Sequence, residues 1–534
     1  MRRPFLILST LCFAAIAAGC SGGSAPTPAA GTIGAPGGVS NARLVDSGIA
    51  HPKFLRLLRT PNHPPPIRHR ITAAERARSL AAGWAPIANV PSFTNGAETA
   101  LLLTDGSVIV HDYCTPNWYR LAPDSNGNYA TGNWSKIASM PSNYGPLYFA
   151  SAVLADGKVI VQGGEYNGSS CSGVETPLGA MYDPVKNAWT AVTGPSGWSQ
   201  IGDAQSAVLS NGTYMLGNCC QSVQALLNEA SMSWTQIGSG KQDTNSEEGW
   251  TLLPNGDVLA TNVFDPPYAQ VYNPGANQWQ SAGQTPVNLV SGYEIGPQTL
   301  RPDGTVWVAG ATGYSAIYNS NTGSWSSGPT FPTVGGQQLD VADGPSTLLT
   351  DGKVMVAASP GLYQTPASIL LFNGKKLKLI PGPPNLPNDS SYNVRLLMLP
   401  NGQVFEDDFS NNVEIYTPAH SRARNAPQIS YVPSTLTHGQ TYTISGTLFN
   451  GMSQANMYGD DVQQATNFPL VRITNTSTGH VFYARTHNHS FMGVASKQSV
   501  STSFDVPKSI ETGASTVVVV ANGIASPPVN VTIN

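Results

Sequence analysis

Acidic, aromatic and amide side chains recur at one register of this 534-residue chain, eight or nine residues ahead of a series of tight turns. They are Tyr148, Asp203, Glu247 with Glu248, Glu294, Asp343, and Tyr392 with Asn393; the first repeat has Ala97 or Glu98 there. Carboxylates that converge in one cleft could bind a hard cation such as Ca²⁺, hydrogen-bond sugar hydroxyls, or serve as an acid–base pair. Capping of exposed backbone groups at strand starts is the alternative role for any single one of them.

The turns that set this register are Asp-Gly or Asn-Gly pairs between runs of alternating apolar residues. They lie at Asp105-Gly106, Asp156-Gly157, Asn211-Gly212, Asn255-Gly256, Asp303-Gly304, Asp351-Gly352 and Asn401-Gly402, which gives intervals of 51, 55, 44, 48, 48 and 50 residues. Such pairs supply the positive φ of tight hairpin turns, and a period near fifty indicates one four-stranded blade per repeat. The sequence therefore predicts an all-β protein with a seven-bladed kelch-type β-propeller, whose inner strands bring these polar residues to the axis.

The two ends of the repeat region predict how the ring closes and where it stops. The seventh repeat lacks the Trp of a last strand, and the strand-like residues 83–87 supply one, so we expect the N-terminal strand to complete that blade. Beyond Pro418, short alternating strands predict an immunoglobulin-like β-sandwich. We expect the propeller over residues 83–422 and the sandwich over residues 423–534.

The N-terminus predicts export. Arg2 and Arg3 precede an apolar run that ends in Ala-Ala-Gly-Cys at residues 17–20, which resembles a bacterial lipobox. We expect a signal peptide over residues 1–20, a lipid on Cys20, and a protein anchored to a membrane of the cell envelope; ordinary secretion is the alternative. Residues 21–82 predict a flexible tether that ends in a basic arm, either resting on anionic headgroups or solvated. A net charge of −4 argues against nucleic acid as a partner.

Four cysteines remain, Cys114, Cys171, Cys219 and Cys220, each after the second strand of its blade. Export favours disulfides. The connectivity stays open, because adjacent Cys219 and Cys220 could form a vicinal bridge or bond to two different partners. A thiolate metal site is the alternative.

A kelch propeller followed by an immunoglobulin-like domain, after an export signal, resembles the galactose oxidase and glyoxal oxidase family of copper radical oxidases, whose C-terminal part is an early-set domain. The resemblance covers residues 84–534. It implies an axial copper held by a Tyr cross-linked to a Cys, a second Tyr followed directly by a His, and a His from the C-terminal domain. By position these roles fall to Tyr148, Tyr392 and His487, with His489 as a second choice for the last.

Two parts of that copper site are missing from the sequence. Residues 95–99 contain no Cys for the cross-link, and Asn393 stands where a His would follow Tyr392. Without them the Tyr radical lacks its tuning modification and copper loses a ligand. We therefore predict a galactose oxidase-like kelch protein whose acidic axis binds a carbohydrate or another small polar ligand, with calcium or copper as the metals to consider. A copper-dependent oxidase with an altered site, a carboxylate-based hydrolase or lyase, and a scaffold are the alternatives.

Overall fold

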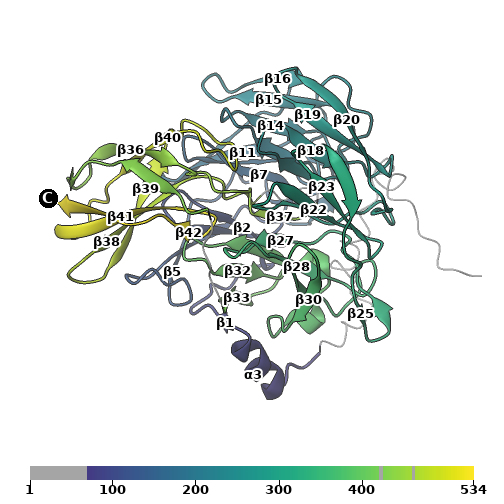
Figure 1. Ribbon diagram of the computed structural model, residues 1–534, viewed down its shortest axis with the longest axis horizontal. Helices are drawn as coiled ribbons and strands as arrows, with labels where there is room; N and C mark the ends of the chain where they lie inside the picture. The colour runs from purple at the N-terminus through teal and green to yellow at the C-terminus, as the bar shows by residue number, and fades with distance from the viewer. Residues whose placement is uncertain (1–68, 420–424, 460–463) are drawn as a thin grey trace, which may run out of the picture. The chain divides into compact units, whose positions relative to one another are not determined.

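The computed structural model describes residues 69–419, 425–459 and 464–534 (Figure 1). The predicted signal peptide, Cys20 and most of the predicted tether lie outside these ranges. Within them the chain is almost entirely β-structure, with one α-helix, α3 (Ala73–Ala81), and two short 3-10 helices, η1 (Leu386–Asn388) and η2 (Ser391–Asn393). None of the described helices is long and apolar enough to cross a bilayer.

In the described part of the chain, seven antiparallel sheets form the blades, each running outward from its inner strand. Blade 1 is β2 (Ala97–Leu102), β3 (Val108–Asp112), β4 (Trp118–Ala122) and β5 (Asn133–Lys136). Blade 2 is β7 (Ala150–Val153), β8 (Val159–Gln162), β11 (Gly179–Asp183) and β12 (Ala188–Ala191). Blade 3 is β13 (Ser206–Val208), β14 (Tyr214–Gly217), β15 (Gln224–Asn228) and β16 (Ser233–Ile237). Blade 4 is β17 (Trp250–Leu252), β18 (Val258–Thr261), β19 (Tyr268–Asn273) and β20 (Gln278–Gln284).

The remaining blades follow the same plan. Blade 5 is β21 (Gln298–Leu300), β22 (Thr305–Ala309), β23 (Ser315–Asn319) and β24 (Ser324–Ser327). Blade 6 is β27 (Ser346–Leu348), β28 (Val354–Ala358), β29 (Ser368–Phe372) and β30 (Leu377–Ile380). Blade 7 is β31 (Arg395–Met398), β32 (Val404–Asp407), β33 (Val413–Tyr416) and β1 (Trp84–Pro86). Smaller sheets join β6 (Pro146–Leu147), β9 (Tyr166–Asn167) and β10 (Ser172–Gly173), and β25 (Thr333–Val334) with β26 (Gln337–Gln338).

These sheets confirm the predicted propeller and its closure. Strand β1 pairs with β33, so that Trp84 lies opposite Tyr416. The Trp84 side chain is buried, and its indole N–H donates to the Pro381 carbonyl at 2.8 Å. The first strand of the propeller therefore completes its last blade and covers the outer edge of β33.

The region just before β1 differs from the predicted tether. Thr72 and Glu75 form a capping box that starts α3, and the Ser79 hydroxyl donates to the Gly382 carbonyl at 2.8 Å. The pattern Thr-x-x-Glu is a helix-start signal visible in the sequence. The end of the expected tether is thus a helix that contacts the propeller.

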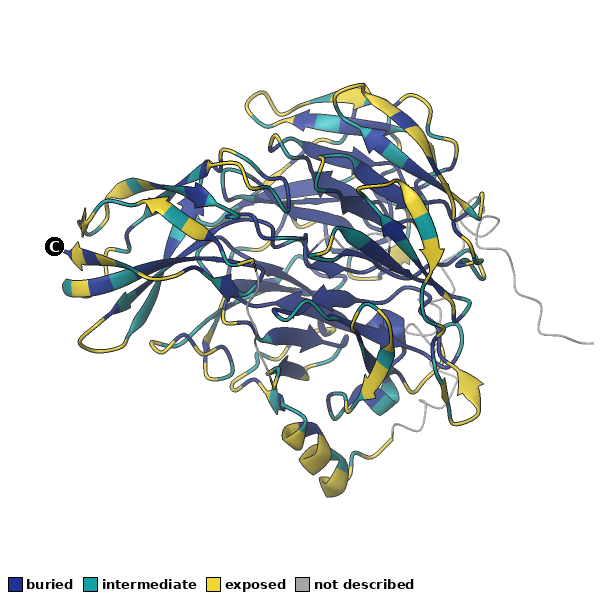
Figure 2. Cartoon of the chain, in the orientation of Figure 1, coloured by how far each residue is buried: buried dark blue, intermediate teal, exposed yellow. Residues whose placement is uncertain are grey.

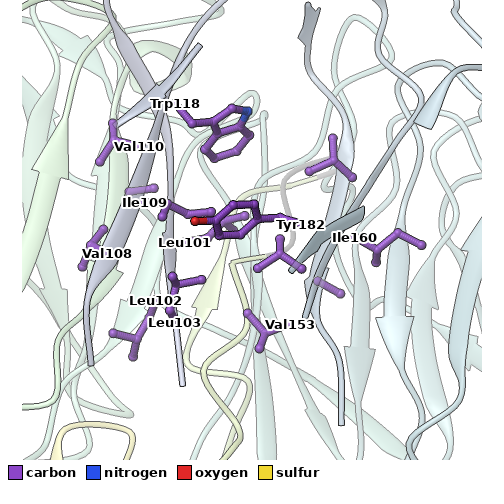
Figure 3. Close-up of a cluster of buried hydrophobic side chains, with 14 of the residues drawn as sticks. Leu101, Leu102, Leu103, Val108, Ile109, Val110, Trp118, Val153, Ile160 and Tyr182 are labelled. Carbon is purple, nitrogen blue, oxygen red and sulfur yellow. The ribbon is translucent and has the colours of Figure 1, made fainter. Parts of the chain in front are cut away.

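Apolar side chains between neighbouring blades form the core. Inner strands such as β2 and β7 are buried along their whole length, whereas outer strands such as β16 carry exposed residues (Figure 2). Figure 3 shows Leu101, Ile109 and Trp118 of blade 1 facing Ile160 and Tyr182 of blade 2. Each fully buried side chain of this size contributes about 1.5–3 kcal/mol, so blade-to-blade packing fixes the inner strands in place.

After blade 7 the chain forms a second group of strands. They are β34 (Gln428–Tyr431), β35 (Thr435–Leu436), β36 (Thr441–Thr447), β38 (Leu470–Asn475), β39 (Val481–His487), β40 (Val500–Asp505), β41 (Gly513–Ala521), β42 (Ile524–Ala525) and β43 (Val529–Ile533). Backbone hydrogen bonds join this group to the hairpin turns of the propeller, from Thr486 to Thr104, from His489 to Ala155 and from Met492 to Ser210. These strands lie against the turn side of blades 1–3; their immunoglobulin-like class stays a prediction.

One stretch between β36 and β38 enters the propeller, and we call residues 454–459 and 464–467 the axial segment. Its strand β37 (Asn456–Met457) pairs with the inner strand β27 and adds a fifth strand to blade 6. Gln454 accepts from Leu252 N of blade 4 at 2.7 Å, and Gln464 donates to the Ala100 carbonyl of blade 1 at 2.6 Å. The axial segment therefore joins inner strands from several sides of the ring.

Two glutamates of blade 7 face each other next to the closing strand. Glu406 of β32 is the register partner of Glu414 of β33, and both are buried. Burial, and next the charge of Glu414, raise the pKa of Glu406 well above its usual range. Burial and then the charge of Asp408 raise the pKa of Glu414 to about 7, although Arg76 of α3 opposes that shift. The pair therefore holds protons that the unfolded chain would release.

This pair predicts how stability changes with pH. Acids whose folded pKa is raised stabilise the fold fully below their unfolded value of 4.5, and that contribution is lost as the pH rises through about 7. We predict that Glu414→Gln flattens the fall in unfolding free energy between about pH 5 and about pH 8, by on the order of 3 kcal/mol. Chemical denaturation at both pH values measures it. Glu511→Gln is the control, because the pKa of Glu511 is lowered; equal pH slopes in Glu414→Gln and wild type would contradict the prediction.

Candidate axial site

Three carboxylates from neighbouring blades meet beside the inner strands. Glu247 precedes β17, Glu294 precedes β21 and Asp343 precedes β27, and one oxygen of each lies within 4.8 Å of the other two. Their exposed fractions are 3%, 0% and 0%. Like charges this close in a low-dielectric interior repel strongly. The group, which we call the acid triad, is therefore a candidate cation site.

The backbone in front of the inner strands positions the triad. Glu247 and Asp343 have φ values of 58° and 48°, and Tyr293, just before Glu294, has 64°. For residues other than Gly this left-handed conformation costs roughly 1–2 kcal/mol, so packing and pairing of the blades must hold it. The Tyr363 hydroxyl donates to Glu294 Oε1, and the ring of Tyr363 meets Tyr392 edge to face at 5.4 Å between centroids.

Glu248, predicted with Glu247, belongs to a different contact. Its carboxylate forms an ion pair with Lys241 at 3.0 Å, with both side chains fully buried, and accepts from the Trp250 indole at 2.9 Å. Burial raises the pKa of Glu248 to about 7, although the charge of Lys241 opposes the shift. Glu248 therefore satisfies buried partners inside blade 4.

Asp203 and Asn393, also predicted for the acidic ring, make other contacts. The Asp203 amide donates to Glu175 Oε2 at 3.1 Å. The Asn393 side chain accepts from the Ser390 amide at 3.1 Å and caps η2. The structure thus brings three of the six predicted ligand-binding residues together in the triad.

An arginine that the sequence register did not single out lies beside this region. Arg395, the first residue of β31, forms an ion pair with Glu98 at 3.0 Å, and both side chains are fully buried. Its guanidinium lies 3.7 Å from the ring centroid of Tyr458 in the axial segment and donates to the Tyr392 carbonyl at 2.7 Å. Burial alone would raise the pKa of Glu98, but a hydrogen bond with His111 and the charge of Arg395 hold it below its usual value.

Of the residues expected for copper, Tyr148 and Tyr392 both lie beside Arg395, whereas the described contacts of His487 are with other residues. Tyr148 lies in a cluster with Tyr166 and Phe409, with ring centroids 6.2 Å away in each case. His487 on β39 contacts Asp505 at 3.1 Å, and its neighbour Arg485 donates to the carbonyl of Asp156 in the turn of blade 2. Strand β7 separates Tyr148 from that turn.

His489, the second choice for the histidine ligand, also contacts residues other than Tyr148 and Tyr392. It is buried against Phe468, and burial lowers its pKa to about 3. The part of the C-terminal region that reaches the inner strands is the axial segment, and residues 454–467 contain no His in the sequence. The sequence pair Thr486-His487 does not indicate which loop of the C-terminal region enters the ring.

The four cysteines form disulfides between Cys114 and Cys171 and between the adjacent Cys219 and Cys220. The first bridge lies in the cluster of Tyr148 and Tyr166. The second leaves neither sulfur as a thiolate, so the thiolate metal site considered for the sequence is not formed in this state.

Comparison with known proteins gives one sequence relative. No family model matches the chain. The Kelch-like protein terF of Aspergillus terreus is 27% identical over 136 residues, which are 24% of this chain and 26% of the relative. The match thus spans about a quarter of that protein's length. The seven blades make the chain an all-β propeller protein, and the similarity to a Kelch-like protein fits that fold.

Solved structures give weaker likenesses. A fungal alcohol oxidase of the AA5 family, in complex with copper, has a TM-score of 0.47 and 14% identity over 85% of this chain and 100% of its own. Virginiamycin B lyase from Staphylococcus aureus has a TM-score of 0.45 and 10% identity over 63% of this chain and 98% of its own. TM-scores and identities this low do not indicate a shared activity.

The buried ion pair predicts a large effect of removing one charge. Glu98→Gln removes the carboxylate charge of this buried ion pair with Arg395, and we expect a loss of about 3–5 kcal/mol in unfolding free energy. Asp303→Asn is the control, because Asp303 forms an ion pair with Arg301 and its side chain is half-exposed. We expect this change to lower the unfolding free energy by about 1 kcal/mol or less. Denaturant titration measures both, and equal small losses would show that the buried pair is not needed.

Proposed function

We propose that this protein is an exported kelch-type propeller protein that binds a divalent, oxygen-preferring cation, with Ca²⁺ as the best fit, at Glu247, Glu294 and Asp343. Its proposed role is to bind a carbohydrate or another small polar ligand beside that cation. The observation behind the proposal is the convergence of three buried carboxylates within 4.8 Å of one another. A cation offsets their repulsion without the protonation of two or three acids.

The chemistry of the donors favours calcium over copper. The triad offers carboxylate oxygens, and the Tyr363 hydroxyl is bonded to one of them. Hard cations prefer such oxygen sets, whereas copper prefers imidazole and thiolate. A copper radical oxidase also needs a histidine beside Tyr148 and Tyr392, and the described contacts of His487 with Asp505 and of His489 with Phe468 do not favour it.

Aromatic rings near the triad support a polar, ring-shaped ligand. Phe264 and Tyr293 stack with centroids 5.0 Å apart and are partly exposed, and Tyr293 directly precedes Glu294. Sugars present hydroxyls to a cation and apolar faces to such rings.

Export rests on two independent features. Arg2 and Arg3, the apolar run and Cys20 are typical of a bacterial lipoprotein signal. The disulfides Cys114–Cys171 and Cys219–Cys220 belong to an oxidising compartment. Anchoring to a membrane through a lipid on Cys20 is part of this proposal.

Calcium binding gives the direct test of the proposal. We predict that the EDTA-treated protein binds one Ca²⁺ by titration calorimetry and gains about 2.7 kcal/mol of stability at a free Ca²⁺ concentration of a hundred times Kd. Glu294→Gln and Asp343→Asn should each weaken binding about tenfold or more, because each removes a negatively charged oxygen ligand.

A matched control comes from the same register. Asp203→Asn changes an acid that precedes the inner strand of blade 3 but is not part of the triad, and Ca²⁺ affinity should stay within about twofold of wild type. Equal loss in Asp203→Asn and Asp343→Asn, or no Ca²⁺ binding by the folded wild type, would contradict the proposal. Copper bound in place of calcium would favour the oxidase.

A further inference from the structure

Among the residues that the structure describes, one group of side chains outside the triad has the composition of a metal site. Glu175, Cys219 and Cys220 each offer a ligand atom, and these atoms all lie within 4.8 Å of one another. Cys219 Sγ lies 3.6 Å from Glu175 Oε2. In the structure the two sulfurs are bonded to each other, so this arrangement becomes a dithiol only after reduction.

The positions of both cysteines are set by contacts other than the disulfide. The Cys219 amide donates to the Ile201 carbonyl at 3.0 Å, and the Cys220 amide donates to Asn218 Oδ1 at 3.2 Å. Asn218 in turn donates to the Gln200 carbonyl at 2.8 Å. Since these hydrogen bonds do not involve sulfur, they keep both side chains near Glu175 when the S–S bond is broken.

A glycine leaves the space that the three groups share. Gly202 has φ of 68°, and a methyl group on its Cα would overlap the Glu175 carboxylate and lie 2.6 Å from Cys219 Sγ. The neighbouring Asp203 amide holds Glu175 Oε2 at 3.1 Å. The carboxylate is thus directed beside Cys219 by the backbone of residues 202–203.

We propose that Glu175, Cys219 and Cys220 form a redox-gated site for a thiophilic divalent cation of the Zn²⁺ type. A dithiol reductant supplies two electrons and two protons, the Cys219–Cys220 bond breaks to give two thiols, and the reductant becomes a disulfide. Zn²⁺ then displaces both thiol protons to solvent and forms two Zn–S bonds, with the Glu175 carboxylate as third ligand. A disulfide oxidant then takes the two electrons back and becomes two thiols, Zn²⁺ is released to solvent, and the Cys219–Cys220 bond forms again.

The exposure of the group fits an exchangeable ion. Cys219 is 1% exposed, whereas Cys220 is partly exposed in the turn between β14 and β15. A reductant can therefore reach Cys220 Sγ, with Cys219 as the leaving thiolate. Three protein ligands leave a fourth tetrahedral position for water or a ligand, as in open zinc sites.

The test uses the full chain, reduced with a dithiol and freed of the reductant without oxygen. Cd²⁺ is the probe, because thiolate–Cd²⁺ bonds give an ultraviolet charge-transfer band. We expect one equivalent to bind to the reduced protein and none to the oxidised protein at these sulfurs. Alkylation and mass spectrometry identify which cysteines the metal protects, with Cys219 and Cys220 expected.

Two variants separate the site from general thiol binding. Cys219→Ser/Cys220→Ser should lose the band while keeping the melting temperature of the reduced wild type. Glu175→Gln keeps both thiols but removes the carboxylate. The affinity for Cd²⁺ should therefore fall by about tenfold or more. Protection of Cys114 and Cys171 instead, a band that persists in the double variant, or unchanged affinity in Glu175→Gln would overturn the proposal.

Discussion

The hydrogen-bonded pairing of β1 with β33 is the constraint on which the axial site depends. The acid triad takes one residue from each of three blades, and Arg395 of blade 7 pairs with Glu98 of blade 1 across the point where the ring closes. Blades packed only through apolar side chains could slide or splay. A closed ring fixes every inner strand relative to the others, so side chains far apart in sequence meet at ångström precision.

Buried acids in this protein are stabilised in different ways. Glu98 and Glu248 lie against Arg395 and Lys241, and these ion pairs return part of the desolvation penalty. Glu406 and Glu414 lie against each other, and their raised pKa values keep protons on the pair. For the acid triad we propose the third solution, a divalent cation. The neighbouring side chains thus decide whether a buried carboxylate is stabilised by a positive side chain, by a proton or, as we propose for the triad, by a metal ion.

Much of the fold could be predicted from the sequence because its signals are local and repeated. Asp-Gly and Asn-Gly turns gave the seven blades, and the missing Trp of the last repeat gave the closing strand β1. The register also selected the triad. It could not separate Glu247 from Glu248, since consecutive residues face opposite ways and only tertiary packing decides which one turns inward. The axial segment and Arg395 escaped prediction because long-range pairing carries no periodic signal.

The chemical expectation depended on which C-terminal stretch enters the ring. His487 was chosen for its place after a Thr, but β37 and its flanks reach the inner strands and present Tyr458 to Arg395. The most direct measurement is anomalous diffraction from crystals grown with Ca²⁺. We predict one peak about 2.3–2.6 Å from oxygens of Glu247, Glu294 and Asp343. A triad without a peak in Ca²⁺-saturated crystals, or a peak only elsewhere, would contradict it.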